Sequence, residues 1–408
     1  MASDAALSVS RADSLRLALI AASSGFGQSA LLALVPIVTE RTGLASPQIG
    51  AVAFLGAAVF LVAAPLWGHH GAAWRIRPFF AGLACLMIAG QGLFLGALYV
   101  GVPAAALGLL LVSRLLYSVG AAGVMPHAQA AIVQRSVAER RPAALANLSA
   151  GLNVGRIAGS LVTLGAGAGV IVPVVMMVVS PVLLLCAPNL PAAPAVGKKG
   201  ETSSRRADIR RVLPLLAVGF ALTFGFGQIQ LVLGLFLQHR FGLDAIAAAG
   251  LGGATYAAVA VAMIATQILL VPRLAFKLGR NMRWGVAGFA LGCLAIILAP
   301  LPWLVPAAAV WAGIGLAVAT PAYTACLSQR VTAHRQAGAA GWLASTHAAG
   351  QGLGALCGGA AFALSPELPF AMAVGIAIAT CLALLRLDDR AEDEMPRDEV
   401  SRDHGAAP

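Results

Sequence analysis

Charged residues are scarce in this chain. They make up 11% of its 408 residues, whereas a soluble globular protein carries roughly 25%. Hydrophobic residues make up 59%, and the mean hydropathy is +0.86. A soluble fold of this length has no interior large enough to hide so many apolar side chains, so we expect a lipid bilayer to surround most of the chain.

Carboxylates are scarcest where the sequence is most apolar. None of the sixteen Asp and Glu residues lies in the middle of an apolar run, and eight of them fall in the tail from Asp388 onward. The six cysteines all lie within apolar runs, and no pair has metal-ligand spacing with a nearby histidine. No nucleophile stands beside a base. We therefore expect free thiols, no metal, no cofactor and no enzyme activity.

The apolar residues gather into long runs, each separated from the next by a short polar connection. A helix that crosses a bilayer needs about 20 mostly apolar residues. The runs therefore predict an all-α membrane protein with twelve transmembrane helices, the first of them retained in the mature protein. They lie near residues 17–39, 47–68, 79–99, 104–133, 143–165, 170–187, 213–238, 246–271, 284–300, 303–328, 339–362 and 368–386.

Basic residues are distributed unevenly between the two sides of such a bundle. The net charge of +11 could suggest a nucleic-acid partner. However, if the N-terminus is cytoplasmic, 23 of the 27 Lys and Arg residues fall in cytoplasmic segments. The positive-inside rule thus predicts a multi-pass protein of a bacterial-type inner membrane, with both termini in the cytoplasm and no nucleic-acid partner.

The two halves of the sequence resemble each other. The segment Gly25-Phe-Gly-Gln28 recurs 200 residues later as Gly225-Phe-Gly-Gln228, and several further matches link 126–159 to 321–354 at an offset of 195. Such matches favour a duplication of six helices. We expect an N-terminal half at 1–187, a cytoplasmic linker at 188–212, a C-terminal half at 213–386 and a cytoplasmic acidic, disordered tail at 387–408.

Two motifs lie in the fourth and fifth runs. In the fourth run, Arg114 is followed by small residues that end at Pro126. In the fifth run, glycines repeat from Gly151 to Gly159, with Arg156 among them. These motifs resemble those of the major facilitator superfamily, and most closely its drug-proton antiporter branch, although Ser118 stands where the family usually has glycine and Arg156 replaces a proline. The resemblance covers nearly the whole chain and implies two pseudo-symmetric six-helix bundles.

The resemblance also implies gating loops after the second and eighth runs. Each of these loops keeps the glycine and basic residues of the family pattern but lacks its carboxylate, with Ala72 and Phe276 at the acidic positions. The matching residues are Gly68, Arg77, Lys277, Gly279 and Arg280.

Two arginines are the most telling candidates for a substrate site. Arg114 lies about ten residues into its run, which places it roughly 15 Å deep, and Arg156 is similarly deep. Arg156 shares one predicted helix face with Ser149, Asn153 and Ser160. A charge at this depth is costly, so each arginine either faces a cavity and binds substrate or ties helices together.

Uncharged and titratable residues complete the candidate site. Tyr117 lies one turn from Arg114, and Gln351 matches Arg156 in the repeat. Gln28 and Gln228 occupy matching places and could bind substrate or join helices. His127 and His347 are the candidates for proton coupling, or else structural residues. The predicted substrate-binding residues are Arg114, Arg156, Tyr117, Asn153, Gln28, Gln228 and Gln351.

These observations predict a secondary transporter that works by alternating access. The family resemblance implies an exporter of amphipathic drugs, driven by protons. A secreted metabolite such as a siderophore is the other candidate, because its carboxylate or hydroxamate groups would suit Arg114 and Arg156. The two arginines favour an anionic substrate. An importer of a small organic anion is the main alternative, and a membrane-embedded receptor or enzyme is a second one. We expect the protein to be a monomer.

Overall fold

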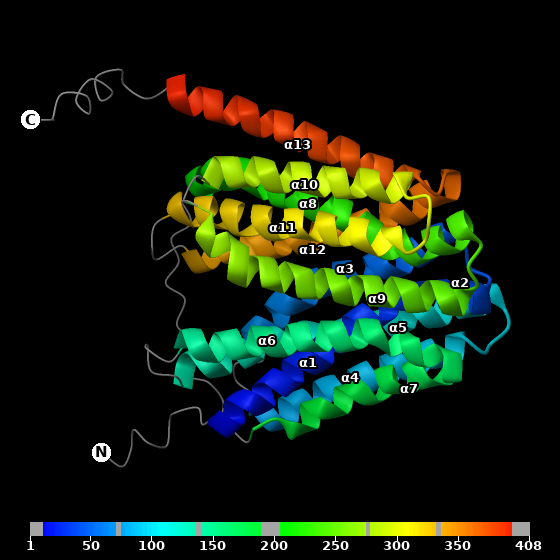
Figure 1. Cartoon of the computed structure of the whole chain (residues 1–408). Helices are drawn as coiled ribbons and strands as arrows, with labels where there is room; N and C mark the ends of the chain where they lie inside the picture. The colour runs from blue at the N-terminus through cyan, green and yellow to red at the C-terminus, as the bar shows by residue number, and fades with distance from the viewer. Residues whose placement is uncertain are drawn as a thin grey trace, which may run out of the picture.

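A computed structural model describes residues 11–70, 75–135, 141–188, 205–274, 278–331 and 336–393. These residues form helices and short connections, with no β-strand among them, so the predicted all-α class is confirmed (Figure 1). The first half contains α1 (Arg11–Ala33), α2 (Val35–Thr42), α3 (Ser46–His70), α4 (Ile76–Ala97), α5 (Pro103–Arg135), α6 (Arg141–Leu161), η3 (Val162–Ala168), α7 (Ile171–Val179) and η4 (Ser180–Cys186).

The second half repeats this arrangement. It contains α8 (Arg205–Phe241), α9 (Ala245–Ala265), η5 (Thr266–Leu270), η6 (Val271–Arg273), α10 (Leu278–Leu298), α11 (Leu304–Gln329), α12 (Gln336–Leu364) and α13 (Leu368–Asp393). Four predicted runs are each built from more than one helical piece, because the helix changes its winding within the run. These are 17–39, 143–165, 170–187 and 246–271.

Nine helices in the described part of the chain are long and apolar enough to cross a membrane. The helix pair Ile171–Cys186 is apolar but shorter. The other two long helices, α6 and α12, carry more polar and glycine residues and do not reach the same hydropathy. All twelve predicted runs are helical, and the number of helices that cross the bilayer stays a prediction.

Glycines set the packing inside each half. A Cβ atom added to Gly155 of α6 would collide with the backbone carbonyl of Ala22 on α1. In the second half, Gly354 of α12 meets the backbone of Phe224 on α8 in the same way. Gly151 and Gly159 extend the first contact, and Gly350 and Gly358 extend the second. Small residues at four-residue spacing thus let two backbones approach closely in both halves.

The two halves meet along two pairs of helices. Gly50 and Ser46 at the start of α3 contact the backbone of α12, and Gly253 near the start of α9 contacts Ser160 near the end of α6. α3 and α9 begin at the end of the bundle opposite to the start of α1 and the end of α13 (Figure 1). Further along α3, Val62 and Leu66 are exposed. The contacts therefore hold the halves together at the end that is far from the termini.

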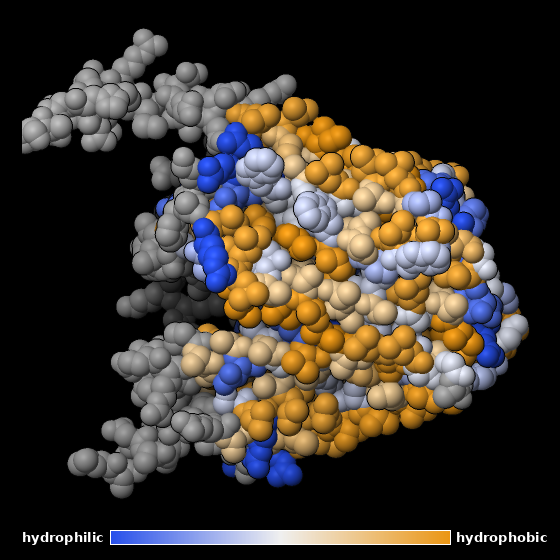
Figure 2. Space-filling model, viewed as in Figure 1, coloured by the Kyte–Doolittle hydropathy of each residue, from blue (hydrophilic) through white to orange (hydrophobic). Residues whose placement is uncertain are grey.

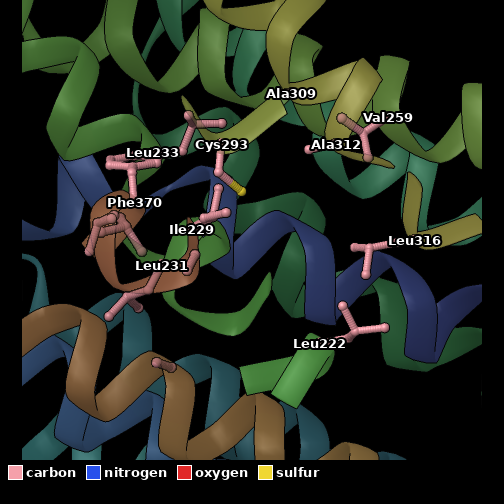
Figure 3. Close-up of a cluster of buried hydrophobic side chains, with 14 of the residues drawn as sticks. Leu222, Ile229, Leu231, Leu233, Val259, Cys293, Ala309, Ala312, Leu316 and Phe370 are labelled. Atoms are coloured by element: carbon pink, nitrogen blue, oxygen red, sulfur yellow. The ribbon is translucent and has the colours of Figure 1, made fainter. Parts of the chain in front are cut away.

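The surface and the core follow the pattern of a membrane protein. Apolar side chains cover the middle of the visible face, and hydrophilic ones gather toward its two ends (Figure 2). Inside the second half, Phe370 of α13 and Cys293 of α10 pack with side chains of α8, α9 and α11 (Figure 3). These apolar walls surround the small number of polar residues that lie at mid-depth.

The structure does not fix the predicted domain boundaries. The linker 188–212 and the tail 387–408 lie largely outside the described residues. Their limits and their cytoplasmic side stay predictions.

Candidate functional site

Arg156 points into the interior of the protein and stays accessible there. Its neighbour Gly155 faces α1, and Val154, which is 62% exposed, marks the outward face of α6. Arg156 follows Val154 by two residues, which is about 200° around a helix, so its side chain leaves from the opposite face. Arg156 is nevertheless exposed. The guanidinium is therefore available to a ligand between the helices.

The polar face of α6 is open toward one end only. Ser149 is exposed and Asn153 is partly exposed, whereas Ser160 is only 2% exposed because α9 covers it at Gly253. The predicted stripe of 149, 153, 156 and 160 thus exists, and it is accessible from the end where α6 begins. Because α6 and α1 run in parallel, this is the end where α1 begins.

A hydrogen-bonded polar cluster in the second half lies at a matching depth. Gln351 of α12 donates from Nε2 to Oε1 of Gln230 on α8 at 2.6 Å, and the hydroxyl of Tyr256 on α9 donates to the carbonyl of Gln230 at 2.5 Å. Gln351 is exposed. It directly follows Gly350, just as Arg156 follows Gly155, so the two residues hold equivalent places in the repeat.

The contact between α6 and α9 shows how deep Arg156 of the first half lies relative to Tyr256 of the second half. Ser160 and Gly253 touch, and the two helices run in opposite directions. Arg156 lies four residues from Ser160, and Tyr256 lies three residues from Gly253. Both lie on the side of the contact that faces away from the end where the two halves touch. At 1.5 Å per residue these offsets are about 6 and 4.5 Å. Arg156 and Tyr256 therefore lie at nearly the same level, one contributed by each half.

Arg114 has a different environment, although it lies equally deep. Its side chain is only 3% exposed and its Nη2 donates to Oε1 of Gln91 on α4 at 3.2 Å. Its guanidinium carbon lies 4.9 Å from the ring centre of Tyr117 and 5.7 Å from that of Phe94. All these contacts come from the first half. In this conformation Arg114 and Tyr117 are closed off from the accessible polar groups.

Ser118 of α5, which stands where the family motif usually has glycine, packs against a glycine on α3. A Cβ atom on Gly56 of α3 would lie 3.2 Å from the hydroxyl oxygen of Ser118. Gly56 thus leaves room for the Ser118 hydroxyl, and the two helices approach closely although residue 118 carries a side chain.

The bond between Gln91 and Arg114 leads to a stability prediction. Gln91→Ala should lower the free energy of unfolding by about 2 kcal/mol, because it leaves a buried guanidinium without its hydrogen-bond acceptor. Denaturant unfolding of the purified protein in detergent measures this loss. Gln351→Ala is the matched control, since water can reach the groups it leaves behind. Equal losses in the two variants would contradict the prediction.

The two repeated glutamines are not equivalent in accessibility. Gln28 on α1 is partly exposed, whereas Gln228 on α8 is fully buried. Neither amide atom of Gln228 has a hydrogen-bond partner within the described residues. Only Gln28 is open to a substrate in this conformation.

The two candidate histidines lie in opposite halves. His127 contacts the carbonyl of Gly123 through Nδ1 at 2.9 Å, and its ring lies 4.0 Å from that of Phe79. His347 on α12 is partly exposed, and its Nε2 lies 2.8 Å from the hydroxyl of the fully buried Tyr323 on α11.

The predicted gating residues fall at helix ends. Gly68 lies in the last turn of α3, and Arg77 is exposed in the first turn of α4. Gly279 and Arg280 lie in the first turn of α10, where Arg280 is exposed. Lys277 lies outside the described residues. In the described part of the chain, one salt bridge is recorded, between Arg16 and Asp13.

Three polar residues of this region were not among the predicted site residues. Gln91, Gln230 and Tyr256 each contribute a hydrogen bond at mid-depth. Their only signal in the sequence is a lone polar group within an apolar run. That signal does not distinguish a residue that binds its neighbour helix from one that faces a cavity. Among the described residues, no three His, Cys, Asp or Glu side chains gather as metal ligands would.

Comparisons with known proteins agree with this architecture. The family model described as the Major Facilitator Superfamily matches residues 17–337 and 282–408. No curated protein sequence matches the chain.

Solved structures resemble the chain over nearly its whole length. The peptide transporter POT in complex with sulfate has a TM-score of 0.74 and 14% identity, and the match covers 96% of this chain and 97% of that one. The nucleoside transporter NupG has a TM-score of 0.70 and 13% identity, with 94% and 100% covered. The human organic anion transporter MFSD10 (TETRAN) has a TM-score of 0.62 and 15% identity, with 92% and 99% covered. The chain belongs to the Major Facilitator Superfamily and is a multi-pass transporter of the membrane.

Proposed function

We propose that this transporter exports a small organic anion and that Arg156 binds the anionic group. One observation carries the proposal: Arg156 is accessible on the inner face of α6, and no salt bridge engages it among the described residues. A cation at this depth is costly unless an anion or water compensates it. A substrate carboxylate or hydroxamate would do so through paired hydrogen bonds.

The groups across from Arg156 suit the rest of such a substrate. Gln351, Gln230 and Tyr256 present amide and hydroxyl groups rather than charges. The substrate would bind with its charged group at the first half and its neutral polar groups at the second. A secreted metabolite such as a siderophore has both kinds of group. An amphipathic drug that carries an acidic group fits the same description.

The contacts between the halves support alternating access. The halves touch at the end far from the termini, and the polar face of α6 is accessible from the other end. We place the termini in the cytoplasm of a bacterial-type inner membrane, so this conformation would load substrate from inside the cell. Rocking of the two halves would then expose the site to the outside. A monomer suffices, because one chain contains both halves.

We propose that protons drive the export and that His347 takes part in coupling. His347 lies on α12 four residues before Gln351, about one helical turn away, and it is partly exposed. Tyr323 shares a hydrogen bond with it and can exchange donor and acceptor roles as the ring titrates. His127 packs on Phe79 in the other half and is the second candidate.

The first test measures retention in cells. Deletion cells would carry the wild type, Arg156→Ala, or no transporter, and would be loaded with an anionic siderophore or a fluorescent cationic drug. We expect the wild type to lower retention of the anion, and Arg156→Ala to slow that export about tenfold or more, because a charge-assisted contact is lost. Arg240→Gln is the control, because this exposed arginine lies in the last turn of α8, away from the candidate site and the predicted gating loops.

Other results of this experiment would support other functions. Expulsion of the cation alone, unchanged in Arg156→Ala, would make Arg156 structural and favour drug export. Greater uptake of added anion by wild-type cells would favour an importer. A protonophore should raise retention of the anion, and unchanged retention would exclude proton coupling.

A further inference from the structure

A groove of about 420 Å³ lies on the outside of the second half, between the end of α9 and the helices α10 and α11. Its polar end is formed by Arg280 and Asn281 in the first turn of α10, and its walls include Trp284 and Trp311. The two tryptophans are 70% and 55% exposed. Trp284 shares its face of α10 with the exposed Leu291, seven residues further on, so the groove faces lipid rather than the interior.

Glycine residues on α10 and α11 and a change in helix winding at the end of α9 create the groove. Gly285, Gly288 and Gly315 line it, and a Cβ atom on Gly288 would lie only 3.3 Å from the Cα of Gly315. The close approach of α10 and α11 leaves a shallow channel where side chains would otherwise project. On the other wall, the end of α9 changes to a π-helix at Thr266–Leu270, which places Leu270 at the rim.

The polar end of the groove is basic. The segment 266–298 contains four basic residues and no Asp or Glu. Arg280 is exposed, and no salt bridge engages it in the part of the chain that the structure describes. Arg273 also lies at this end, where it donates to the carbonyl of Leu269. An anionic group would be favoured here, and the tryptophans beside it are of the kind found at membrane interfaces.

The length of the groove matches one leaflet of a bilayer. Gly292 of α10 lies against Ala312, next to Trp311, so the groove runs from Arg280 to the level of Gly292. Twelve residues of helix span about 18 Å. Half of a hydrocarbon core is about 15 Å thick. A phospholipid would thus place its phosphate at Arg280 and one acyl chain along the glycines.

We propose that this groove is a binding site for an anionic phospholipid of the leaflet on the Arg280 side. The negatively charged head group would lie at Arg280, and the acyl chain would fill the apolar channel between Trp284 and Trp311. Neither the position of the site nor its chemistry depends on the transported substrate, because the groove faces away from Arg156.

The test uses the two tryptophans as reporters, in a full-length protein whose other four tryptophans are replaced by phenylalanine. The full chain would be placed in nanodiscs of phosphatidylcholine that contain the same minor share of either dibrominated phosphatidylglycerol or dibrominated phosphatidylcholine. Bromine quenches tryptophan fluorescence at short range. We expect the phosphatidylglycerol to be preferred about fivefold over phosphatidylcholine, and Arg280→Gln to lose this preference. Arg77→Gln, which removes an exposed arginine from α4, should keep it.

Native mass spectrometry of the same proteins gives a second readout. The wild type and Arg77→Gln should retain phosphatidylglycerol, and Arg280→Gln should not. Equal quenching by the two lipids in the wild type would overturn the proposal. An equal loss in Arg280→Gln and Arg77→Gln would also overturn it, because the effect would then come from overall surface charge.

Discussion

Replacing Gly155 by alanine is expected to lower the free energy of unfolding by at least about 2 kcal/mol, because the packed helices leave no space for the new methyl group. The Cβ atom would collide with the carbonyl of Ala22, and both partners are backbone atoms of packed helices. Relief requires α6 to move away from α1, which would also separate the flanking contacts of Gly151 and Gly159. Denaturant unfolding in detergent measures the loss.

Gly92→Ala on α4 is the matched control. An added Cβ there meets no atom within 4 Å, so the variant should be as stable as the wild type or slightly more so, since alanine favours helix. A Gly155→Ala protein as stable as Gly92→Ala would show that α1 and α6 do not pack as closely as described.

Cross-linking the two halves where α3 meets α12 is expected to stop transport completely. Gly352 of α12, next to Gln351, faces the Cβ atom of Ala57 on α3 across the two halves. In the double variant Ala57→Cys and Gly352→Cys, a small shift suffices to bring the sulfurs into bonding geometry. If α3 and α12 must separate to release substrate, oxidation should reduce export to the level of cells without the transporter, and reduction should restore it.

The two single-cysteine variants control for oxidation of the six natural cysteines, and neither should respond to oxidant. A gel shift of a protein with a cleavage site between the halves would report the extent of cross-linking. Export at the uncross-linked rate from fully cross-linked protein would contradict alternating access by separation of α3 and α12.

The fold could be predicted from the sequence because a lipid bilayer permits few folds for a chain with this composition. Each long apolar run had to become a helix, and the repeated motifs indicated that the two halves fold alike. The structure adds that α6 and α12 pack on α1 and α8. The changes of winding were not predicted. A π-helical turn such as Thr266–Leu270 has the same apolar composition as an α-helix.

The candidate site was less predictable, because depth does not determine accessibility. Arg114 and Arg156 are both lone arginines at mid-depth in apolar runs. One is 3% exposed and bonded to Gln91, and the other is exposed. The difference comes from the neighbouring helices, which are remote in sequence, and a single sequence does not show which helix will face which.

The moderate hydropathy of α6 and α12 has a consequence for biogenesis. Each of these helices forms the fifth apolar run of its half and carries polar residues of the candidate site, so its insertion from the translocon by hydrophobicity alone is unfavourable. The helices that contact their glycine faces, α1 and α8, are synthesised first in each half. Insertion of α6 and α12 is therefore expected to depend on packing against a helix that is already in the membrane. The nascent chain would need the first helix of each half in place before Arg156 or Gln351 could enter the bilayer.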